Sequence, residues 1–290
     1  MKIDTELSYL TALIDDPDYY VESIVMDAMY SRGPSVIKEL FAICKTEKSR
    51  RTRDAILEKI NFLNREFVLD EIRILAKQKD PLLKDGLYLV SKLFDPSLKK
   101  IYFDNTIISI AGEFVNEISD QHTAMERVNI FNHIFYKRLN FTTQDIFMLK
   151  EKNANLLNVL KTNKGNPITI AILYFVIARV VGLQLSPLCF QSGFIPVYID
   201  ENKKSLFYVN IFKDGEIFSE ENLNTFFKSQ GLNYSTKEFR LRKDKTLIII
   251  YLEALFYTYS SKGKEQVVSL INRALELFGD ERFLLNDMDE

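Results

Sequence analysis

Thiol and imidazole groups are the side chains of this sequence best suited to nucleophilic catalysis, and they are few. The 290 residues include two cysteines, Cys44 and Cys189, and two histidines, His122 and His133. A thiol becomes a strong nucleophile when a neighbouring histidine or a helix N-terminus lowers its pKa. Neither cysteine has a histidine close in sequence, and both lie in apolar stretches. This distribution favours two small buried thiols, and two cysteines are too few for a disulfide framework.

The histidines also fail to suggest a metal site. A protein zinc site needs three or four converging ligands. Even if one helix carried both His122 and His133, they would lie about 16 Å apart. We expect His122 near a loop or helix start, and His133 on a helix surface or in packing. The sequence has no phosphate-binding glycine loop and no Gly-x-Ser-x-Gly motif, so we predict no metal and no cofactor.

Cys189 leaves one alternative open. It lies in the run Leu188–Phe190, within a predicted strand, and could act as a relocated nucleophile in a thiol enzyme. The apolar neighbours and the lack of a nearby histidine favour an inert buried thiol.

The clearest local signal is the start of a central helix. Asn166 is a good N-cap residue, and Pro167 is favoured at the first helical position. A strongly apolar run continues from there to about Val181, and Gly182 is typical of a helix end. These residues specify a helix start without requiring an active site.

Beyond this helix the hydrophobic period changes to that of strands. Leu185–Ile199 and Leu206–Ile211 are rich in Phe, Val, Ile and Tyr, with a polar turn at residues 200–204 between them. A short strand is predicted at Ile217–Phe218. Ser219 followed by two acidic residues predicts a helix over Glu220–Ser229.

The order of a helix followed by antiparallel strands resembles the core of papain-like and transglutaminase-like thiol enzymes. The narrower resemblance is to the SirB-type bacterial branch of the transglutaminase-like superfamily, over roughly Leu83 to Phe227. The segments that carry it are Gly165–Tyr174, Ile177–Ala178, Gly182–Leu183, Asp85–Leu89, Val159–Leu160 and Tyr208–Gly215. Ala274–Leu277, near the end of the chain, is similar to the tetratricopeptide-like tail of that family.

The resemblance implies three catalytic positions. A cysteine would begin the central helix, a histidine on the next strand would act as base, and an aspartate on the following strand would orient it. This sequence has Pro167, Gly193 and Asn210 at those positions, and proline at the first is itself typical of the SirB-type branch. None of the three can act as thiolate, imidazole base or anionic partner. We therefore predict no catalytic residues.

The flanking regions are predicted to be helical. Five short amphipathic patterns fill most of the first 82 residues, the fourth at Ile56–Leu63 and the fifth at Val68–Leu75. They suggest a HEAT-like repeat region. Helical patterns at Tyr102–Ile118 and Thr123–Leu139 precede the central helix, and Thr246–Tyr259 and Glu265–Phe278 predict a closing hairpin.

We thus expect a mixed α+β, mostly helical fold in three parts. Residues 1–82 form the helical-repeat region. Residues 83–235 form a degenerate transglutaminase-like domain with a small antiparallel sheet, and residues 236–290 form a tetratricopeptide-like hairpin.

Net charge and the length of the apolar runs argue against nucleic-acid and membrane partners. The formal net charge is −2 and the pI about 5.9, so no strong field draws the chain to nucleic acid or to an anionic membrane. The longest apolar run, Ile170–Ala178, is too short to span a bilayer. The first residues lack the apolar core of a signal peptide, which predicts a cytoplasmic location.

The expected function is a non-catalytic binding or scaffold protein. A cleft between the helix start (Asn166, Thr169) and the strands that carry Gly193 and Asn210 could hold a peptide or a partner protein. Two alternatives remain. One is a transglutaminase-like thiol enzyme of the protease or amidase type that uses an unrecognised nucleophile such as Cys189, and the other is a purely structural role carried by the helical flanks. The sequence indicates no oligomeric state.

Overall fold

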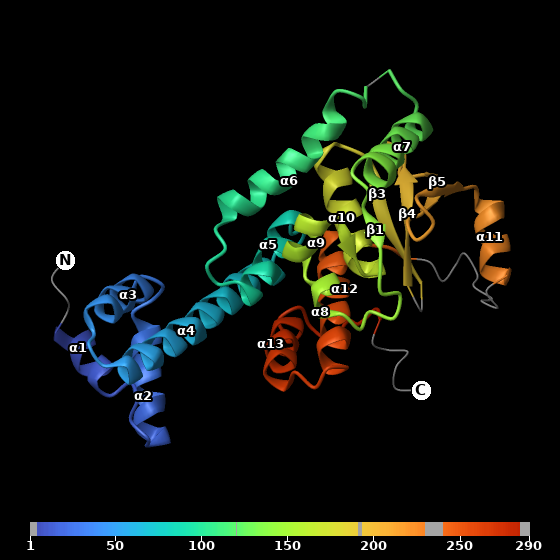
Figure 1. The fold of residues 1–290 in the computed structure, drawn as a ribbon. Coiled ribbons are helices and arrows are strands. Elements are labelled where there is room, and N and C mark those ends of the chain that lie inside the picture. Colours follow the sequence, from blue (N-terminus) through green and yellow to red (C-terminus); the bar gives the residue numbers. More distant parts are fainter. Residues whose placement is uncertain (1–4, 120, 191–192, 230–239, 285–290) are drawn as a thin grey trace. The chain divides into compact units, whose positions relative to one another are not determined.

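The computed structural model describes residues 5–119, 121–190, 193–229 and 240–284. The chain forms two compact units, one of residues 1–72 with 92–97 and the other of residues 73–91 with 98–290 (Figure 1). This division differs from the three segments suggested by the sequence. The closing hairpin belongs to the same unit as the central helix because it packs directly on that helix.

The N-terminal unit consists of helices joined by short turns, with no strand among its described residues. It contains α1 (Thr5–Ala12), α2 (Tyr19–Ser31), α3 (Val36–Thr46) and most of α4 (Arg50–Ala76). The side chain of Asp18 caps α2 by accepting a hydrogen bond from the backbone of Tyr20. Its core is made of buried apolar side chains, chiefly Leu7, Val25, Met29, Val36, Leu40, Ile56, Ile60 and Leu63.

The two patterns at Ile56–Leu63 and Val68–Leu75 belong to one continuous helix, α4, of 27 residues. The residues between them, Asn64 to Phe67, contain neither glycine nor proline. Nothing in that stretch stops a helix, so the predicted break does not occur.

The second unit is built mainly from helices. They are α5 (Leu83–Phe94), α6 (Lys100–Val115), α7 (Ala124–Asn132), the π-helical turn η1 (His133–Arg138), α8 (Glu151–Ala154), α9 (Leu156–Thr162), α10 (Pro167–Val180), α11 (Glu220–Ser229), α12 (Asp244–Ser260) and α13 (Glu265–Glu276). Thr123 caps α7 in a capping box with Glu126. No helix in the described ranges has the length and apolarity to cross a membrane.

The sheet of this unit is a five-stranded antiparallel one with the order β6-β5-β4-β3-β7. Its strands are β3 (Leu185–Phe190), β4 (Gly193–Ile199), β5 (Ser205–Asn210), β6 (Glu216–Phe218) and β7 (Arg240–Leu241). A separate parallel pair joins β1 (Thr142–Thr143) to β2 (Lys164–Gly165). The small antiparallel sheet is confirmed, whereas β1, β2 and β7 have two residues each and carry no readable alternation.

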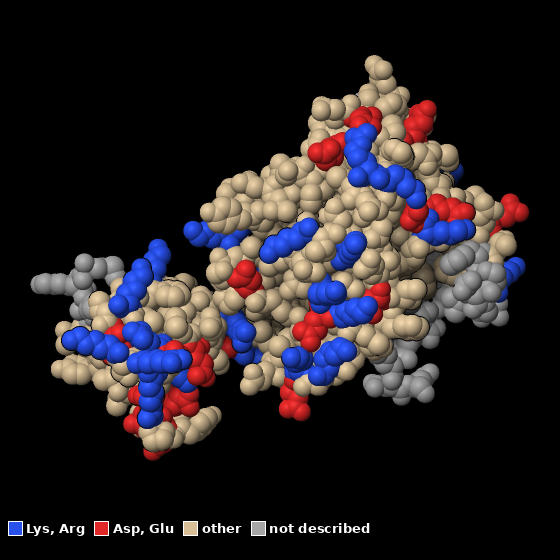
Figure 2. Space-filling view, in the orientation of Figure 1, with Lys and Arg blue, Asp and Glu red and all other residues tan. Residues whose placement is uncertain are grey.

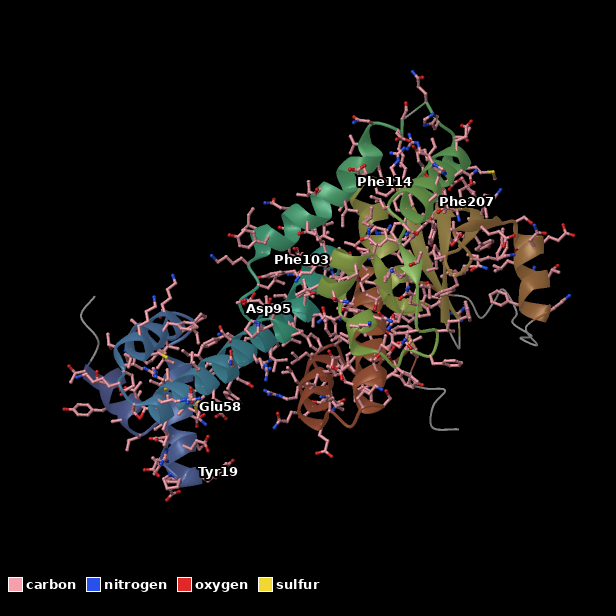
Figure 3. The ribbon with its side chains drawn as sticks, in the orientation of Figure 1. Tyr19, Glu58, Asp95, Phe103, Phe114 and Phe207 are labelled. Atoms are coloured by element: carbon pink, nitrogen blue, oxygen red, sulfur yellow. The ribbon has the colours of Figure 1, made fainter. Side chains whose placement is uncertain are left out.

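Helix α10 lies at the centre of this unit. Every residue from Ile168 to Ala178 is buried, as expected for a helix that is apolar all round. Phe175 packs on Phe194 of the sheet, with ring centroids 6.0 Å apart. Phe103 and Phe114 of α6, labelled in Figure 3, are 2% and 0% exposed and belong to the same core.

The opposite face of the sheet is covered by α11. Leu223 and Phe227 of that helix form a cluster with buried strand residues, namely Leu188, Ile195, Val197, Tyr208 and Phe218. The sheet is thus a middle layer, with α10 on one face and α11 on the other (Figure 1). Helices α12 and α13 pack side by side, joined by residues 261–264, and α12 also packs on α10.

Gly86 allows α5 to pack closely against α12. A Cβ at this position would lie 2.3 Å from Cδ1 of Ile248, a fully buried side chain. We predict that Gly86→Ala destabilises the unit by about 1–3 kcal/mol, because the enclosed isoleucine cannot move aside. Thermal unfolding followed by circular dichroism measures this change.

Gly112→Ala is the matched control. Gly112 is also helical, but a Cβ there meets nothing within 4 Å. Alanine should stabilise this exposed position by about 0.5–1 kcal/mol through its higher helix propensity. Equal effects of the two substitutions would contradict the proposed close contact.

Candidate functional site

The start of α10 is held by hydrogen bonds within the fold. Asn166 Oδ1 accepts the backbone N–H of Thr169 at 2.7 Å, and the Asn166 N–H donates to the carbonyl of Asn153 at 2.8 Å. The Thr169 hydroxyl donates to the Ala154 carbonyl at 3.2 Å. Asn166 and Thr169 are both 0% exposed. These two predicted binding residues therefore position the helix and do not reach the surface.

A groove of about 550 Å³ opens beside Pro167. Its volume lies within the range of pockets that hold small ligands or peptide side chains. Most of its lining residues are apolar, and two of these apolar side chains are exposed: Ile146 at 74% and Phe212 at 53%. The lining residues are Tyr136, Phe141, Thr142, Thr143, Ile146, Pro167, Ile211, Phe212 and Asp214.

The turn that carries Phe212 is held by a buried polar clamp. The Tyr174 hydroxyl donates to Asn132 Oδ1 at 2.7 Å, and Asn132 Nδ2 donates to the Gly215 carbonyl at 2.7 Å. Burial raises the pKa of the Tyr174 hydroxyl, so it stays protonated and remains a donor. Gly215 has φ +80°, and a Cβ there would lie 2.3 Å from the Asn132 side chain. Only glycine fits this contact.

The π-helical turn η1 adds a second hold on the same segment. The Tyr136 hydroxyl donates to the Ile211 carbonyl at 2.9 Å, and burial raises the pKa of this hydroxyl as well. Lys137 pairs with Asp214 at 2.6 Å at the groove rim. The wall made by residues 211–215 is therefore tied to α10, α7 and η1.

Gly193 points toward the α11 side of the sheet. In the register of β3 and β4 it lies opposite Phe190. A Cβ on Gly193 would lie 3.3 Å from the Phe190 ring. That ring meets Phe227 of α11 in an edge-on contact at 5.1 Å. The next residue, Phe194, points the other way and packs on α10.

Asn210 lies on the same face as Gly193. It is two residues beyond Tyr208, which belongs to the cluster under α11, and side chains alternate along a strand. Asn210 Oδ1 accepts the backbone N–H of Phe212 at 3.2 Å, and its carbonyl accepts the N–H of Lys213 and of Gly215. Asn210 thus ends β5 and shapes the turn that carries Phe212.

The three positions matched to the catalytic triad do not line one cavity. Pro167 lines the groove of about 550 Å³. Asn210 lines a separate hollow of about 60 Å³, with Phe190, Phe194 and Phe227 around it. Pro167 and Asn210 are linked through Ile211 and Phe212, which line both hollows.

Cys189 is placed for packing. It lies on β3, opposite Phe194 of β4, and is 5% exposed. Burial raises the pKa of its thiol to about 12, against a smaller lowering by Arg242. The thiolate fraction at neutral pH is then on the order of 10⁻⁵. Cys44 is 8% exposed in the N-terminal unit.

The histidines lie outside the groove. His122 Nδ1 accepts the backbone N–H of Ser119 at 3.1 Å, and His133 begins η1 with its side chain exposed. Across the described ranges, no three His, Cys, Asp or Glu residues lie close enough to hold a metal ion.

Sequence reasoning did not identify the exposed lining of the groove. Ile146 and Phe212 lie in turns, where hydrophobic periodicity is not informative. The available signal was the presence of large apolar residues inside turns, since turns are usually polar. Tyr136 was assigned to a regular helix, and nothing in the sequence marks the π-helical turn.

We predict that Tyr174→Phe destabilises the second unit by about 1–3 kcal/mol, because Asn132 Oδ1 loses its donor in a dry core. Urea unfolding measures the loss. Tyr102→Phe, at a ring that is 63% exposed, should change stability by less than about 0.5 kcal/mol. If Tyr174→Phe lowered the stability no more than Tyr102→Phe does, the hydrogen bond from Tyr174 to Asn132 would contribute nothing to the stability.

We predict slow alkylation of Cys189. In a Cys44→Ala background, iodoacetamide at pH 7.5 should modify Cys189 at least about a hundredfold more slowly than a model thiol, because little thiolate is present. Mass spectrometry gives the rate, and the urea-unfolded chain supplies the fast reference. Alkylation faster than the model thiol would identify an activated nucleophile.

The comparison with known proteins agrees with this architecture. The family model described as the transglutaminase-like superfamily matches residues 103–250, from α6 into α12. The match includes the groove, α10 and the whole five-stranded sheet. No curated protein and no solved structure matches the sequence. Because the match spans half of the chain and contains the central helix with its sheet, this protein belongs to the transglutaminase-like superfamily.

Proposed function

We propose that this protein is a non-catalytic member of its superfamily that binds a peptide or protein segment in the groove beside Pro167. The observation that carries the proposal is the helix start. Pro167 has no thiol, and neither Cys44 nor Cys189 lines the groove. A thiol enzyme of this fold needs a thiolate at that place.

The exposed side chains of the groove favour an apolar ligand. Ile146 and Phe212 line it, and the neighbouring Phe147 is 75% exposed. Burying such a side chain in a complex contributes about 1.5–3 kcal/mol. Several such contacts suffice for micromolar affinity after the entropy of association is subtracted.

The strand β1 favours an extended backbone in the ligand. Thr142 and Gln144 donate their N–H groups to the carbonyls of Asn163 and Gly165, on the β2 side. By strand alternation, the backbone groups of Thr143 point to the opposite side. They offer one N–H and one C=O to a peptide that adds as a strand.

The predicted residues Asn166, Thr169 and Asn210 contribute to this groove indirectly, whereas Gly193 lies against Phe190 on the α11 side of the sheet. Asn166 and Thr169 fix the start of α10, and Asn210 shapes the turn of Phe212. In this proposal they position the groove, and the contacts to the ligand come from Ile146 and Phe212.

The finer assignments rest on the resemblance and on sequence patterns. The SirB-type branch, a HEAT-like N-terminal region, a tetratricopeptide-like tail and a cytoplasmic bacterial setting remain proposals. A thiol enzyme that uses Cys189 is the alternative function, and the burial of that thiol argues against it.

We predict that peptides selected from a displayed random library on the full chain bind through Ile146 and Phe212. Ile146→Asp and Phe212→Asp should each weaken a selected peptide at least about tenfold, because a carboxylate would be buried in an apolar contact. Isothermal titration calorimetry measures the affinity.

Ile108→Asp is the matched control, since Ile108 is 53% exposed on α6 and does not line the groove. It should leave the affinity within about twofold. Selected peptides that bind both groove variants as well as the wild type would refute this location for the site.

A further inference from the structure

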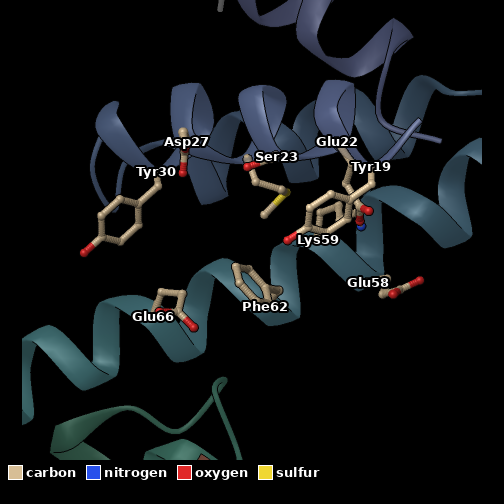
Figure 4. A pocket seen from close by; sticks show the side chains of 10 residues that line it. Tyr19, Glu22, Ser23, Asp27, Tyr30, Glu58, Lys59, Phe62 and Glu66 are labelled. Carbon is tan, nitrogen blue, oxygen red and sulfur yellow. The ribbon is translucent and has the colours of Figure 1, made fainter. Parts of the chain in front are cut away.

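A second groove lies within the N-terminal unit, between α2 and α4. Its volume is about 540 Å³. Side chains from the two helices point toward one another across it (Figure 4). Its lining residues are Tyr19, Glu22, Ser23, Met26, Asp27, Tyr30, Glu58, Lys59, Phe62 and Glu66.

Aromatic rings form part of this surface. Tyr19 is 83% exposed, Phe62 48% and Tyr30 37%. Tyr30 is held in place by stacking on Phe67 at 5.2 Å and by a hydrogen bond from its hydroxyl to Asp70. Exposed aromatic faces attract ammonium and guanidinium groups through the negative face of the ring.

The charge of the lining is strongly negative. Four carboxylates, those of Glu22, Asp27, Glu58 and Glu66, line the groove with one ammonium, that of Lys59. The ammonium is paired with Glu22. Three net negative charges therefore gather here, in a chain whose whole net charge is −2. Figure 2 shows acidic and basic side chains interspersed on one face of this unit.

The spacing of these groups suits an extended segment. Tyr19 and Glu58 lie at one end of the groove, and Tyr30 and Glu66 lie at the other (Figure 4). Tyr19 and Tyr30 are separated by about 16 Å along α2. An extended peptide of about five residues covers that length.

We propose that this groove binds a peptide segment that carries two or more lysine or arginine side chains. The carboxylates of both walls neutralise the cations, and the aromatic rings between them take the aliphatic stems and cationic heads. Because all lining residues belong to the N-terminal unit, this proposal is independent of the groove beside Pro167.

The test uses the full chain and a fluorescent nine-residue peptide with three arginines separated by glycine and serine. A matched peptide with three glutamines replaces the charge. Fluorescence anisotropy at 50 mM salt should show at least about tenfold tighter binding of the arginine peptide. Raising the salt to 300 mM should remove most of that difference, because exposed charges are screened.

Two variants locate the site. The double substitution Asp27→Asn/Glu58→Gln should weaken the arginine peptide about fivefold or more, since two exposed carboxylates are lost. Phe62→Ala should weaken it about threefold through loss of a ring contact. Asp54→Asn, on α4 but outside the groove, should change it by less than about twofold.

Three results would overturn the proposal. The first is equal binding of the arginine and glutamine peptides. The second is undiminished binding by the double variant, provided that its unfolding temperature matches that of the wild type. The third is full displacement of the peptide by spermine at equal charge concentration. The last would assign the groove to a small polyamine.

Discussion

The buried chain of hydrogen bonds from Tyr174 through Asn132 to Gly215 joins the central helix, α7 and the turn between β5 and β6. Tyr174 lies on the central helix, Asn132 ends α7, and Gly215 lies in the turn between β5 and β6. The three residues are buried where these elements meet, so each polar group needs its partner. The glycine is required by both its positive φ and the 2.3 Å approach of Asn132. This constraint fixes the wall of the groove and presents Phe212.

The proposed loss of thiol chemistry is compatible with the frame of this fold. The central helix needs a capped start and an apolar body, and Asn166 and Pro167 supply the start as well as any other pair. Cys189 lies on β3 of the sheet, and burial raises the pKa of its thiol to about 12. Burial that stabilises the core therefore disfavours the reactive thiolate form. The proposed function assigns the groove beside Pro167 to binding.

Much of the fold could be predicted from the sequence where one residue type dictates one local geometry. The central helix begins at Pro167 as its capping signals indicate, and Glu220–Ser229 is helical as its acidic first turn indicates. The sequence predicts two helices where the structure has the single helix α4, because short amphipathic patterns do not show whether the chain between them bends. The lining of the groove could not be predicted, because it depends on which turns meet in space. The strand register decides on which face of the sheet Gly193 and Asn210 lie. The sequence does not reveal that register, so the face could not be predicted.

The most direct test of the account is a mass-spectrometric search for covalent chemistry at the groove. The full chain is incubated for hours with a glutamine-containing peptide selected for binding and with a primary amine, and both protein and peptide masses are followed. The account predicts that neither mass changes while the peptide stays bound. A thioester adduct on the protein, or a peptide that is cleaved, deamidated or joined to the amine, would contradict it. Loss of that change in Cys189→Ala would assign the chemistry to Cys189.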